Sequence, residues 1–299
     1  MRRVLALAAL SAVLLNAQPA PRLEQIDHSI RSAIAGFQGT VSVFAKNLDS
    51  GETYGLRENE RVRTASTIKL AVMAAVFESI ARGQAKWTDQ IVLHDADKVE
   101  GTGVLLEFSD GVRLPLQDLV HLMIVVSDNM ATNLLLDRFT ADAVNAEMDS
   151  LGLKQTRCLR KIMQGSKASG WSRAGLLEEN QRFGLGVTTP KEIATLIEKM
   201  EEGQVVNAAA SREMIAILKR QQDVSGIARG VGELPVADKT GALDHLRSDV
   251  GIVYSPGGRI AIAITVDGLP KLDYTPDNAG CILISELTHL LVDGLSKSH

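Results

Sequence analysis

The sequence predicts an α+β fold in which an antiparallel sheet flanked by helices carries an inserted all-helical lobe. Strand patterns lie towards both ends of the chain, at residues 40–45 and between residues 250 and 266. The stretch from residue 66 to about residue 218 is mainly helical. If strands from both ends pair in one sheet, the helical block becomes a second lobe, and a cleft separates the two.

Each N-terminal element follows from the spacing of its apolar residues. Residues 23–34 repeat apolar side chains at helical spacing, and residues 40–45 alternate as a half-buried strand. Residues 68–77 are apolar almost all round, which predicts a helix buried in the core. Helical patterns at 116–126 and 130–139 are separated by a short polar turn.

The C-terminal part supplies the remaining strands. Residues 235–237 suit a short strand. Residues 250–254 and 259–266 flank the turn sequence Ser255-Pro256-Gly257-Gly258, which indicates a hairpin. Residues 281–295 form an amphipathic pattern that predicts a closing helix.

The chain has 299 residues, which exceeds the usual size of one domain. No Pro-, Gly- or Ser-rich linker and no internal repeat divides it. We therefore expect one body, residues 18–299, with two lobes. The α/β lobe comprises about residues 24–65 and 226–299, and the helical lobe about residues 66–225.

Residues 1–17 have the form of a secretory signal peptide. Arg2 and Arg3 precede an apolar run at 4–15, and Ala17 provides a small residue for cleavage. The run is too short to span a bilayer, and no later segment is long enough for a transmembrane helix. We expect an exported protein, periplasmic or secreted, without membrane insertion.

The composition argues against several partners and cofactors. Loss of residues 1–17 removes two arginines and no acid, so the formal charge moves from −4 to −6, which disfavours nucleic acid. The six histidines lack metal-ligand spacing, and we expect no metal and no other cofactor. Cys158 and Cys281 leave a disulfide open, because export permits one without requiring it. A monomer is expected.

Three short motifs follow one another along the chain and together carry acyl-transfer chemistry. They supply a nucleophile, two amines, a second hydroxyl and an amide: Ser66-Thr67-Ile68-Lys69, Ser127-Asp128-Asn129 and Lys239-Thr240-Gly241. A lone Ser-x-x-Lys arises by chance roughly once in a few hundred residues, and a serine before a helix is often only an N-cap. All three motifs in this order predict an acyl-transfer site. The absence of a G-x-S-x-G elbow argues against an ordinary Ser-His-Asp hydrolase.

The first motif supplies a nucleophile and a base. Lys69 follows Ser66 by one helical turn, so its amine lies on the same face and can approach the Ser66 hydroxyl. A serine hydroxyl is a weak nucleophile, and a buried lysine beside a second cation, here Lys239, loses its proton readily enough to activate it. The amide of Ser66 at the helix N-terminus provides one oxyanion donor.

The other two motifs have both a functional and an ordinary interpretation. Ser127 is assigned the transfer of a proton to the leaving nitrogen, and Asn129 the binding of an acylamino carbonyl. Thr240 is assigned the substrate carboxylate, and Gly241 lets a ligand lie close to the backbone. Asp128 stabilises the turn in either interpretation. The ordinary interpretation is structural, because the same residue types are common in polar turns and at strand edges.

With these motifs the chain resembles the serine penicillin-recognising superfamily, and class A β-lactamases most closely. The resemblance spans about residues 24–296 and implies a β-lactamase/transpeptidase-like fold with the motifs lining the cleft. It implies that the amide of Ala242 is the second oxyanion donor. It also implies that Lys239, Thr240 and a following arginine bind the carboxylate of a β-lactam or D-alanyl peptide. Arg247 is the first candidate for that arginine, against a solvated turn residue, and Arg229 is the reserve.

One segment departs from the class A pattern. These enzymes carry R-x-E-x-x-L-N on a loop below the nucleophile, and its glutamate positions the deacylating water. Here Arg160 is followed by Lys161 and Ile162, and no acidic residue occurs from 154 to 177. A longer loop leaves Glu178 or Glu179 as candidates for a relocated base. Otherwise Lys69 or Ser127 activates water, as in the penicillin-binding relatives.

Three functions remain open at this point. A β-lactamase would open the β-lactam amide through a Ser66 acyl-enzyme and hydrolyse it quickly. A D-alanyl-D-alanine carboxypeptidase or transpeptidase would stay acylated by β-lactams. A non-catalytic penicillin-binding sensor is the third. The layout favours the first function and the missing glutamate favours the second, whereas the complete set of acylation residues disfavours the third.

Overall fold

The computed structural model describes residues 21–163 and 167–296, so the expected signal peptide lies outside the described residues. Five strands form the main sheet: β1 (Thr40–Asn47), β2 (Thr53–Leu56), β8 (Val236–Leu243), β9 (Leu246–Ser255) and β10 (Gly258–Asp267). Three helices border it: α1 (Pro21–Ile34), α9 (Ile227–Val231) and α10 (Ala279–Leu295). The predicted first helix, first strand, C-terminal hairpin and closing helix are all present.

The remaining elements lie between β2 and α9 in the sequence. The helices are η1 (Ala65–Ile68), α2 (Lys69–Ala81), η2 (Asp95–Asp97), η3 (Leu105–Glu107), α3 (Leu116–Val125), α4 (Asn129–Phe139), α5 (Ala141–Ser150), α6 (Glu178–Gln181), α7 (Pro190–Glu201) and α8 (Ala208–Leu218). The strands are β3 (Val62–Arg63), β4 (Gln90–Val92), β5 (Arg113–Pro115), β6 (Arg157–Cys158) and β7 (Gly186–Thr188). This lobe is mainly rather than entirely helical, because strands of two or three residues are too short to show an alternating pattern.

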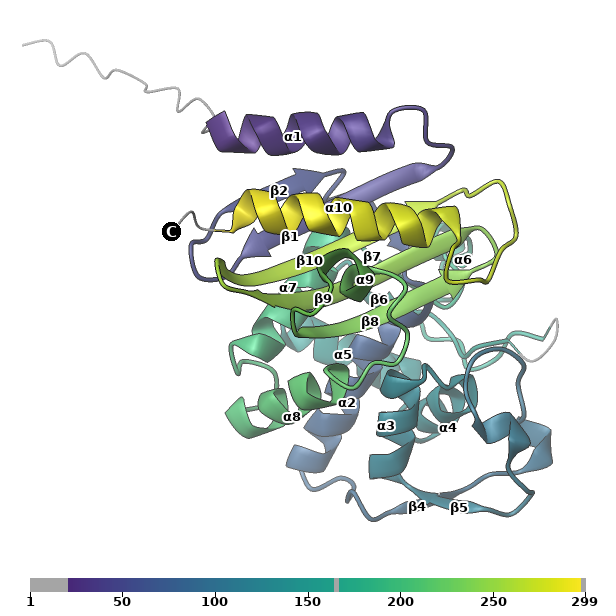
Figure 1. The fold of residues 1–299 in the computed structure, drawn as a ribbon. Helices are drawn as coiled ribbons and strands as arrows, with labels where there is room; N and C mark the ends of the chain where they lie inside the picture. The colour runs from purple at the N-terminus through teal and green to yellow at the C-terminus, as the bar shows by residue number, and fades with distance from the viewer. Residues whose placement is uncertain (1–20, 164–166, 297–299) are drawn as a thin grey trace, which may run out of the picture.

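The main sheet joins strands from both ends of the chain. Its order is β2-β1-β10-β9-β8, and every neighbouring pair is antiparallel. Thr40 pairs with Asp267 at one end of β1 and Asn47 with Ile260 at the other. Strand β8 therefore forms one edge, and it is the strand nearest the helical lobe (Figure 1).

The two faces of the sheet contribute to different cores. Helices α1 and α10 lie side by side over one face (Figure 1), where Ile30, Ile264 and Leu287 are fully buried. The opposite face packs on α7 and on the helical lobe, whose centre is α2. Every residue of α2 from Lys69 to Phe77 is buried, as the apolar run predicted. Because burial of apolar area dominates folding, α2 is a fixed support for the residues at its start.

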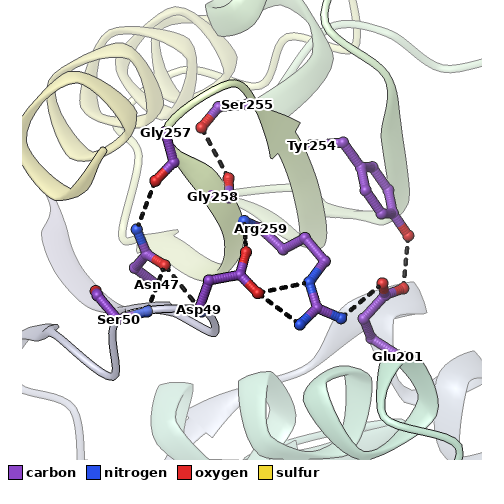
Figure 2. Close-up of polar contacts among 9 residues, drawn as sticks. All are labelled: Asn47, Asp49, Ser50, Glu201, Tyr254, Ser255, Gly257, Gly258 and Arg259. Atoms are coloured by element: carbon purple, nitrogen blue, oxygen red, sulfur yellow. Dashed lines mark hydrogen bonds and ion pairs between the residues drawn. The ribbon is translucent and has the colours of Figure 1, made fainter. Parts of the chain in front are cut away.

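The end of the sheet opposite the third motif is closed by a polar network around Asn47 and Arg259 (Figure 2). The buried Asn47 amide donates to the carbonyls of Gly257 at 3.1 Å and Leu295 at 2.7 Å. Its side-chain oxygen accepts from the amides of Asp49 and Ser50. This one side chain therefore joins the β1–β2 turn, the β9–β10 turn and the end of α10.

The two cysteines of the chain are not paired with each other. Cys158 on β6 and Cys281 on α10 are both buried and free, so no disulfide joins them. Burial raises the pKa of the Cys158 thiol to about 12. Within residues 21–163 and 167–296, no helix is long and apolar enough to cross a membrane.

Candidate active site

Ser66 lies on the short turn η1, which leads directly into α2. The cap positions of η1 and α2 are occupied by Thr64 and Ile68, so Ser66 is not the helix cap that its sequence context also allowed. Ala65 adopts a positive φ of 47°, an uncommon conformation for a residue with a side chain. The neighbours Thr67 and Ile68 are buried, whereas Ser66 is only half-buried. The fold thus holds this serine at the boundary of the core with its side chain accessible.

Lys69 is completely buried, and its amine is held by the second motif. Its Nζ donates to Ser127 O at 2.7 Å, Ser127 Oγ at 3.1 Å and Asn129 Oδ1 at 3.0 Å. Burial, reinforced by the charge of Lys239, lowers the pKa of Lys69 well below its usual value. The sequence predicted contact with Ser66, but in the described part of the chain these three acceptors take the hydrogen bonds of the amine. Lys69 therefore connects the first motif to the second.

The second motif is a tight turn between α3 and α4. Ser127 has a positive φ of 54°, and Asp128 is the N-cap of α4, accepting from the amide of Ala131. The Asp128 carboxylate also accepts from the amides of Val104 at 2.7 Å and Leu105 at 2.9 Å. Asp128 thus fixes both the turn and the neighbouring loop, in agreement with the structural role predicted for it.

The third motif lies on the edge strand β8, where Lys239 and Thr240 are buried. A side chain at Gly241 would meet Thr64 O at 3.0 Å and Ser66 N at 3.2 Å. Gly241 was expected to let a ligand lie close to the strand backbone. The segment that lies close to it in the structure is η1. Burial lowers the pKa of Lys239 to about 8, although nearby carboxylates oppose this shift. Lys239 Nζ donates to Thr240 O at 2.8 Å.

The carboxylates around Lys239 were not recognised in the sequence. Asp238 precedes Lys239 on β8, and Asp249 lies on β9 opposite Thr240. Burial raises the pKa of Asp238 well above its usual range and that of Asp249 to about 7. Both carboxylates raise the pKa of Lys239 and help to keep its amine charged. Both aspartates can be seen in the sequence, but the pairing of β9 with β8, which brings them together, is determined only by the fold.

Arg247 is a buried residue of β9 rather than a solvated turn residue. It lies opposite Ala242, and its Nη1 donates to the carbonyls of Leu243 and Leu246, both at 2.6 Å. Its Nη2 donates to the Asp273 carbonyl, and the guanidinium stacks on Tyr274 at 4.9 Å. The reserve candidate Arg229 is exposed and pairs with Asp277. Arg247 is thus the arginine that the fold places beside the third motif.

Two cavities meet at Ser66. The first, of about 310 Å³, is lined by parts of all three motifs, including Ser66, Ser127, Thr240, Gly241 and Ala242, and is called the motif cavity. The second, of about 690 Å³, is called the loop cavity. It is lined by Ser66, Asn129 and Ala242 together with the segments 160–163 and 182–185. Arg247 lines a further cavity beside Thr240 and Gly241. The fold therefore brings the predicted acylation residues together around Ser66.

Comparison with known proteins agrees with this arrangement. Residues 25–295 match the family model described as "Beta-lactamase enzyme family". The chain belongs to the β-lactamase enzyme family. The β-lactamase from Sphaerobacter thermophilus is 34% identical with a TM-score of 0.79, over 91% of this chain and 97% of that one. β-Lactamase SME-1 from Serratia marcescens is 26% identical over 69% of this chain and 67% of its own length.

A fold similarity extends to penicillin-binding relatives. A PBP-A variant, solved as an acyl-enzyme complex with penicillin G, is 23% identical with a TM-score of 0.75. The alignment covers 91% of this chain and 95% of that one. At this level of identity the similarity shows the common fold. The β-lactamase family fold predicted from the three motifs is confirmed.

The loop that contains Ile162 is held to α4 by Asn133. Asn133 donates to Ile162 O at 3.0 Å and accepts from Ile162 N at 2.8 Å. These backbone bonds place residue 162 in the lining of the loop cavity, with an isoleucine side chain. Glu178 and Glu179 are exposed on α6 and do not line either cavity at Ser66. The structure does not bring these two candidate bases to the nucleophile.

The described residues contain no arrangement of side chains that suits a metal ion. No group of three or more His, Cys, Asp or Glu side chains there is placed to coordinate one.

The sequence analysis also missed Asn133, which follows Asn129 by one helical turn on α4. That spacing places both amides on one face of the helix and was the available signal.

Proposed function

We propose that this protein is a serine β-lactamase that opens the β-lactam amide through an acyl-enzyme on Ser66. The observation that carries the proposal is the buried Lys69 amine, which is hydrogen-bonded to Ser127 and Asn129 one turn from Ser66. Its lowered pKa favours the neutral form that a general base requires. Membership of the β-lactamase family and 34% identity to the Sphaerobacter thermophilus enzyme support the same function.

The reaction that fits this site begins with proton transfer. Neutral Lys69 takes the proton of Ser66, and the serine oxygen forms a bond to the β-lactam carbonyl carbon. The amides of Ser66 and Ala242 stabilise the negative oxygen. Ser127 then passes its hydroxyl proton to the ring nitrogen as the carbon–nitrogen bond breaks, and receives from Lys69 the proton that came from Ser66. The ester on Ser66 remains, with the ring opened.

The remaining groups bind and orient the substrate. We assign the substrate carboxylate to Thr240 and the charge of Lys239, with Arg247 and Gly241 shaping that end of the site. Asn129 holds the acylamino carbonyl. Hydrolysis of the acyl-enzyme needs an activated water, and Lys69 is the group we assign to it. Under this proposal the protein is exported after loss of residues 1–17, acts as a monomer and protects its host against β-lactams.

The decisive experiment compares turnover with covalent labelling. Nitrocefin reports hydrolysis, and a fluorescent penicillin reports a lasting acyl-enzyme. A β-lactamase turns over nitrocefin repeatedly and loses the label. If the protein neither hydrolyses nitrocefin nor becomes labelled, the assignment of Ser66 chemistry is wrong.

A second function is favoured by one specific observation. The resemblance to class A enzymes predicts the deacylating glutamate at position 162, and an isoleucine lines the loop cavity there, so a D-alanyl-D-alanine carboxypeptidase-like protein with slow deacylation also fits. A label that persists for hours, together with release of D-alanine from a D-alanyl-D-alanine peptide, would support this second function over the first.

A further inference from the structure

Three arginines line the loop cavity, and the part of the lining that they form is called the arginine wall. Arg63 comes from β3, Arg160 from the loop after β6, and Arg182 from the residue that follows α6. Asp244 is the acidic residue in the described lining, and it accepts a hydrogen bond from Tyr274 at 2.5 Å. The cavity is therefore electropositive at this wall, although the chain as a whole is acidic.

These three arginines differ in whether their charge is already neutralised. Arg63 forms an ion pair with Asp267. Arg160 donates to the Lys161 carbonyl at 2.8 Å, and Arg182 stacks on Phe183. Among the described residues, which contain every Asp and Glu of the sequence, neither Arg160 nor Arg182 forms an ion pair. Two guanidinium charges are thus left without a protein anion.

The packing of these two side chains leaves their donors available. Arg160 lies 5.6 Å from the ring centre of Trp171, and Arg182 lies 4.5 Å from that of Phe183. Stacking uses the flat face of a guanidinium and leaves the N–H groups in its plane for an acceptor. The Arg160 head group also approaches Gly184 on the cavity wall, 3.7 Å from where a Cβ would be. Both cations are therefore supported by aromatic rings beside the cavity.

The position of the arginine wall relative to Ser66 determines which part of a bound substrate reaches these arginines. This step rests on the proposed function. The substrate carboxylate is assigned to the Thr240 side, and Asn129 holds the acylamino carbonyl. Asn129 lines the loop cavity, so the substituent beyond that carbonyl enters it. The acyl side chain is consequently directed towards Arg160 and Arg182.

We propose that the loop cavity selects β-lactams or peptides whose acyl side chain carries a second carboxylate, bound by Arg160 and Arg182. A planar guanidinium matches a carboxylate in a bidentate geometry, and such charge-assisted hydrogen bonds are stronger than neutral ones. An uncharged side chain leaves both cations unneutralised. A side-chain ammonium group is repelled by them.

Three penicillins that differ at one carbon test the proposal. Benzylpenicillin has no charge on its side chain, carbenicillin adds a carboxylate there, and ampicillin adds an ammonium group. We expect the second-order acylation rate constant to fall in the order carbenicillin, benzylpenicillin, ampicillin. The advantage of carbenicillin over benzylpenicillin should be about tenfold at low ionic strength and should shrink as salt is added.

Arg160→Gln and Arg182→Gln should each lower the carbenicillin rate several-fold more than the benzylpenicillin rate. Arg173→Gln is the matched control, because Arg173 is a highly exposed arginine of the same loop that pairs with Asp142 and does not line the cavity. It should leave the ratio of the two rates unchanged. Thermal unfolding of each variant checks that the loop still folds.

The outcomes separate this inference from the proposed function. If all three penicillins acylate Ser66 at equal rates, the inference is wrong and the proposed function stands. The same holds if the ratio survives in the Arg160→Gln/Arg182→Gln double variant. If none of the penicillins acylates Ser66, both the function and the inference fail.

Discussion

The amine of Lys69, the first residue of α2, lies 3.1 Å from Ser127 Oγ on the turn before α4, and both residues are buried. This contact joins the base assigned to the serine with the hydroxyl assigned to the leaving nitrogen. A proton taken from Ser66 therefore has a direct route to Ser127 through one nitrogen. Asp128 fixes the turn that carries Ser127, and Lys69 lies on the buried helix α2, so the Lys69–Ser127 half of this route is held in place.

Replacement of the nucleophile should abolish acylation without changing the fold. Ser66→Ala removes the one hydroxyl assigned to attack, so we expect no mass increase when the intact protein is incubated with benzylpenicillin. Ser79→Ala is a suitable control because its hydroxyl bonds Ala75 O further along α2. An acyl adduct of unchanged yield in Ser66→Ala would remove Ser66 from its assigned role.

The charge of Lys239 should control the reaction with carboxylate-bearing substrates. A charge-assisted contact of this kind contributes on the order of 1.5–3 kcal/mol, so Lys239→Ala should slow acylation by about one to two orders of magnitude. Arg247→Ala should have a smaller effect, because its donors are engaged by carbonyls. Stopped-flow acylation measures both variants. An esterified penicillin that reacts as fast as the free acid would contradict the assignment.

The pH dependence of acylation should show the loss of the Lys239 charge. Burial lowers the pKa of Lys239 to about 8, and raising the pH removes the proton that carries the charge. Acylation should therefore fall above about pH 8, by up to about tenfold per pH unit. In Lys239→Arg the charge does not titrate in this range, so the fall should disappear. An identical fall in that variant would assign the titration to another group.

A neighbouring carboxylate offers an independent check on the same titration. Asp249 raises the pKa of Lys239, so Asp249→Asn should move the fall in acylation to lower pH. The asparagine oxygen preserves the acceptor for the Ile227 amide, which Asp249 Oδ2 binds at 2.8 Å. A profile that does not move would show that Asp249 has little influence on the amine.

Deacylation should limit turnover because Ile162 has no group that can activate water. We expect a burst of one equivalent of opened benzylpenicillin, followed by a slow steady rate. A general base contributes about a hundred- to ten-thousand-fold, so Ile162→Glu should raise the steady rate within that range, whereas Ile162→Gln should not. Stopped-flow absorbance measures both phases. Fast linear turnover by the unmodified protein, with no burst, would contradict this prediction.

The two exposed glutamates provide the counter-test for that prediction. Glu178→Gln and Glu179→Gln should leave the steady rate unchanged, because neither residue lines a cavity at Ser66. A variant that converts turnover into a burst would identify a relocated base. If neither does, Lys69 remains the group assigned to both half-reactions.

The Asn47 network should matter for stability and not for catalysis. Asn47→Ala leaves the carbonyls of Gly257 and Leu295 without their donor, which should lower the free energy of unfolding by about 2–4 kcal/mol. Asn59→Ala removes an exposed amide and should change it by less than about 0.5 kcal/mol. Urea unfolding measures both. A changed acylation rate in folded Asn47→Ala would reveal coupling between the two ends of the sheet.

The sequence was sufficient for elements whose pattern is long and local. The strand at 40–45, the hairpin at 250–266 and the buried helix after Ser66 appear as predicted, because their apolar spacing matches the face that they bury. The chemistry of Ser66, Lys69 and Lys239 could be proposed because three motifs agreed. Contacts between distant segments could not be predicted: Lys69 bonding to Ser127, or Gly241 packing on Ser66, depends on how the lobes meet.

The arginine wall of the loop cavity could not be predicted from the sequence either. Arg63, Arg160 and Arg182 are far apart in the sequence, and each alone resembles an ordinary surface cation. Their convergence depends on the pairing of β3 with β7 and of β6 with β7, strands too short to recognise. Pairings of two or three residues are fixed by the surrounding fold rather than by local pattern.

The close packing of Gly241 on η1 has a mechanical consequence. The two amides assigned to the oxyanion belong to different lobes, yet at Gly241 the strand β8 packs directly on the backbone of Thr64 and Ser66 and on the Ala65 methyl group. A relative movement of the lobes would have to break that contact, so the nucleophile and the edge strand move as one rigid body. Adaptation to substrates of different shape is therefore left to the cavity lining at residues 101–102, 160–163 and 182–185.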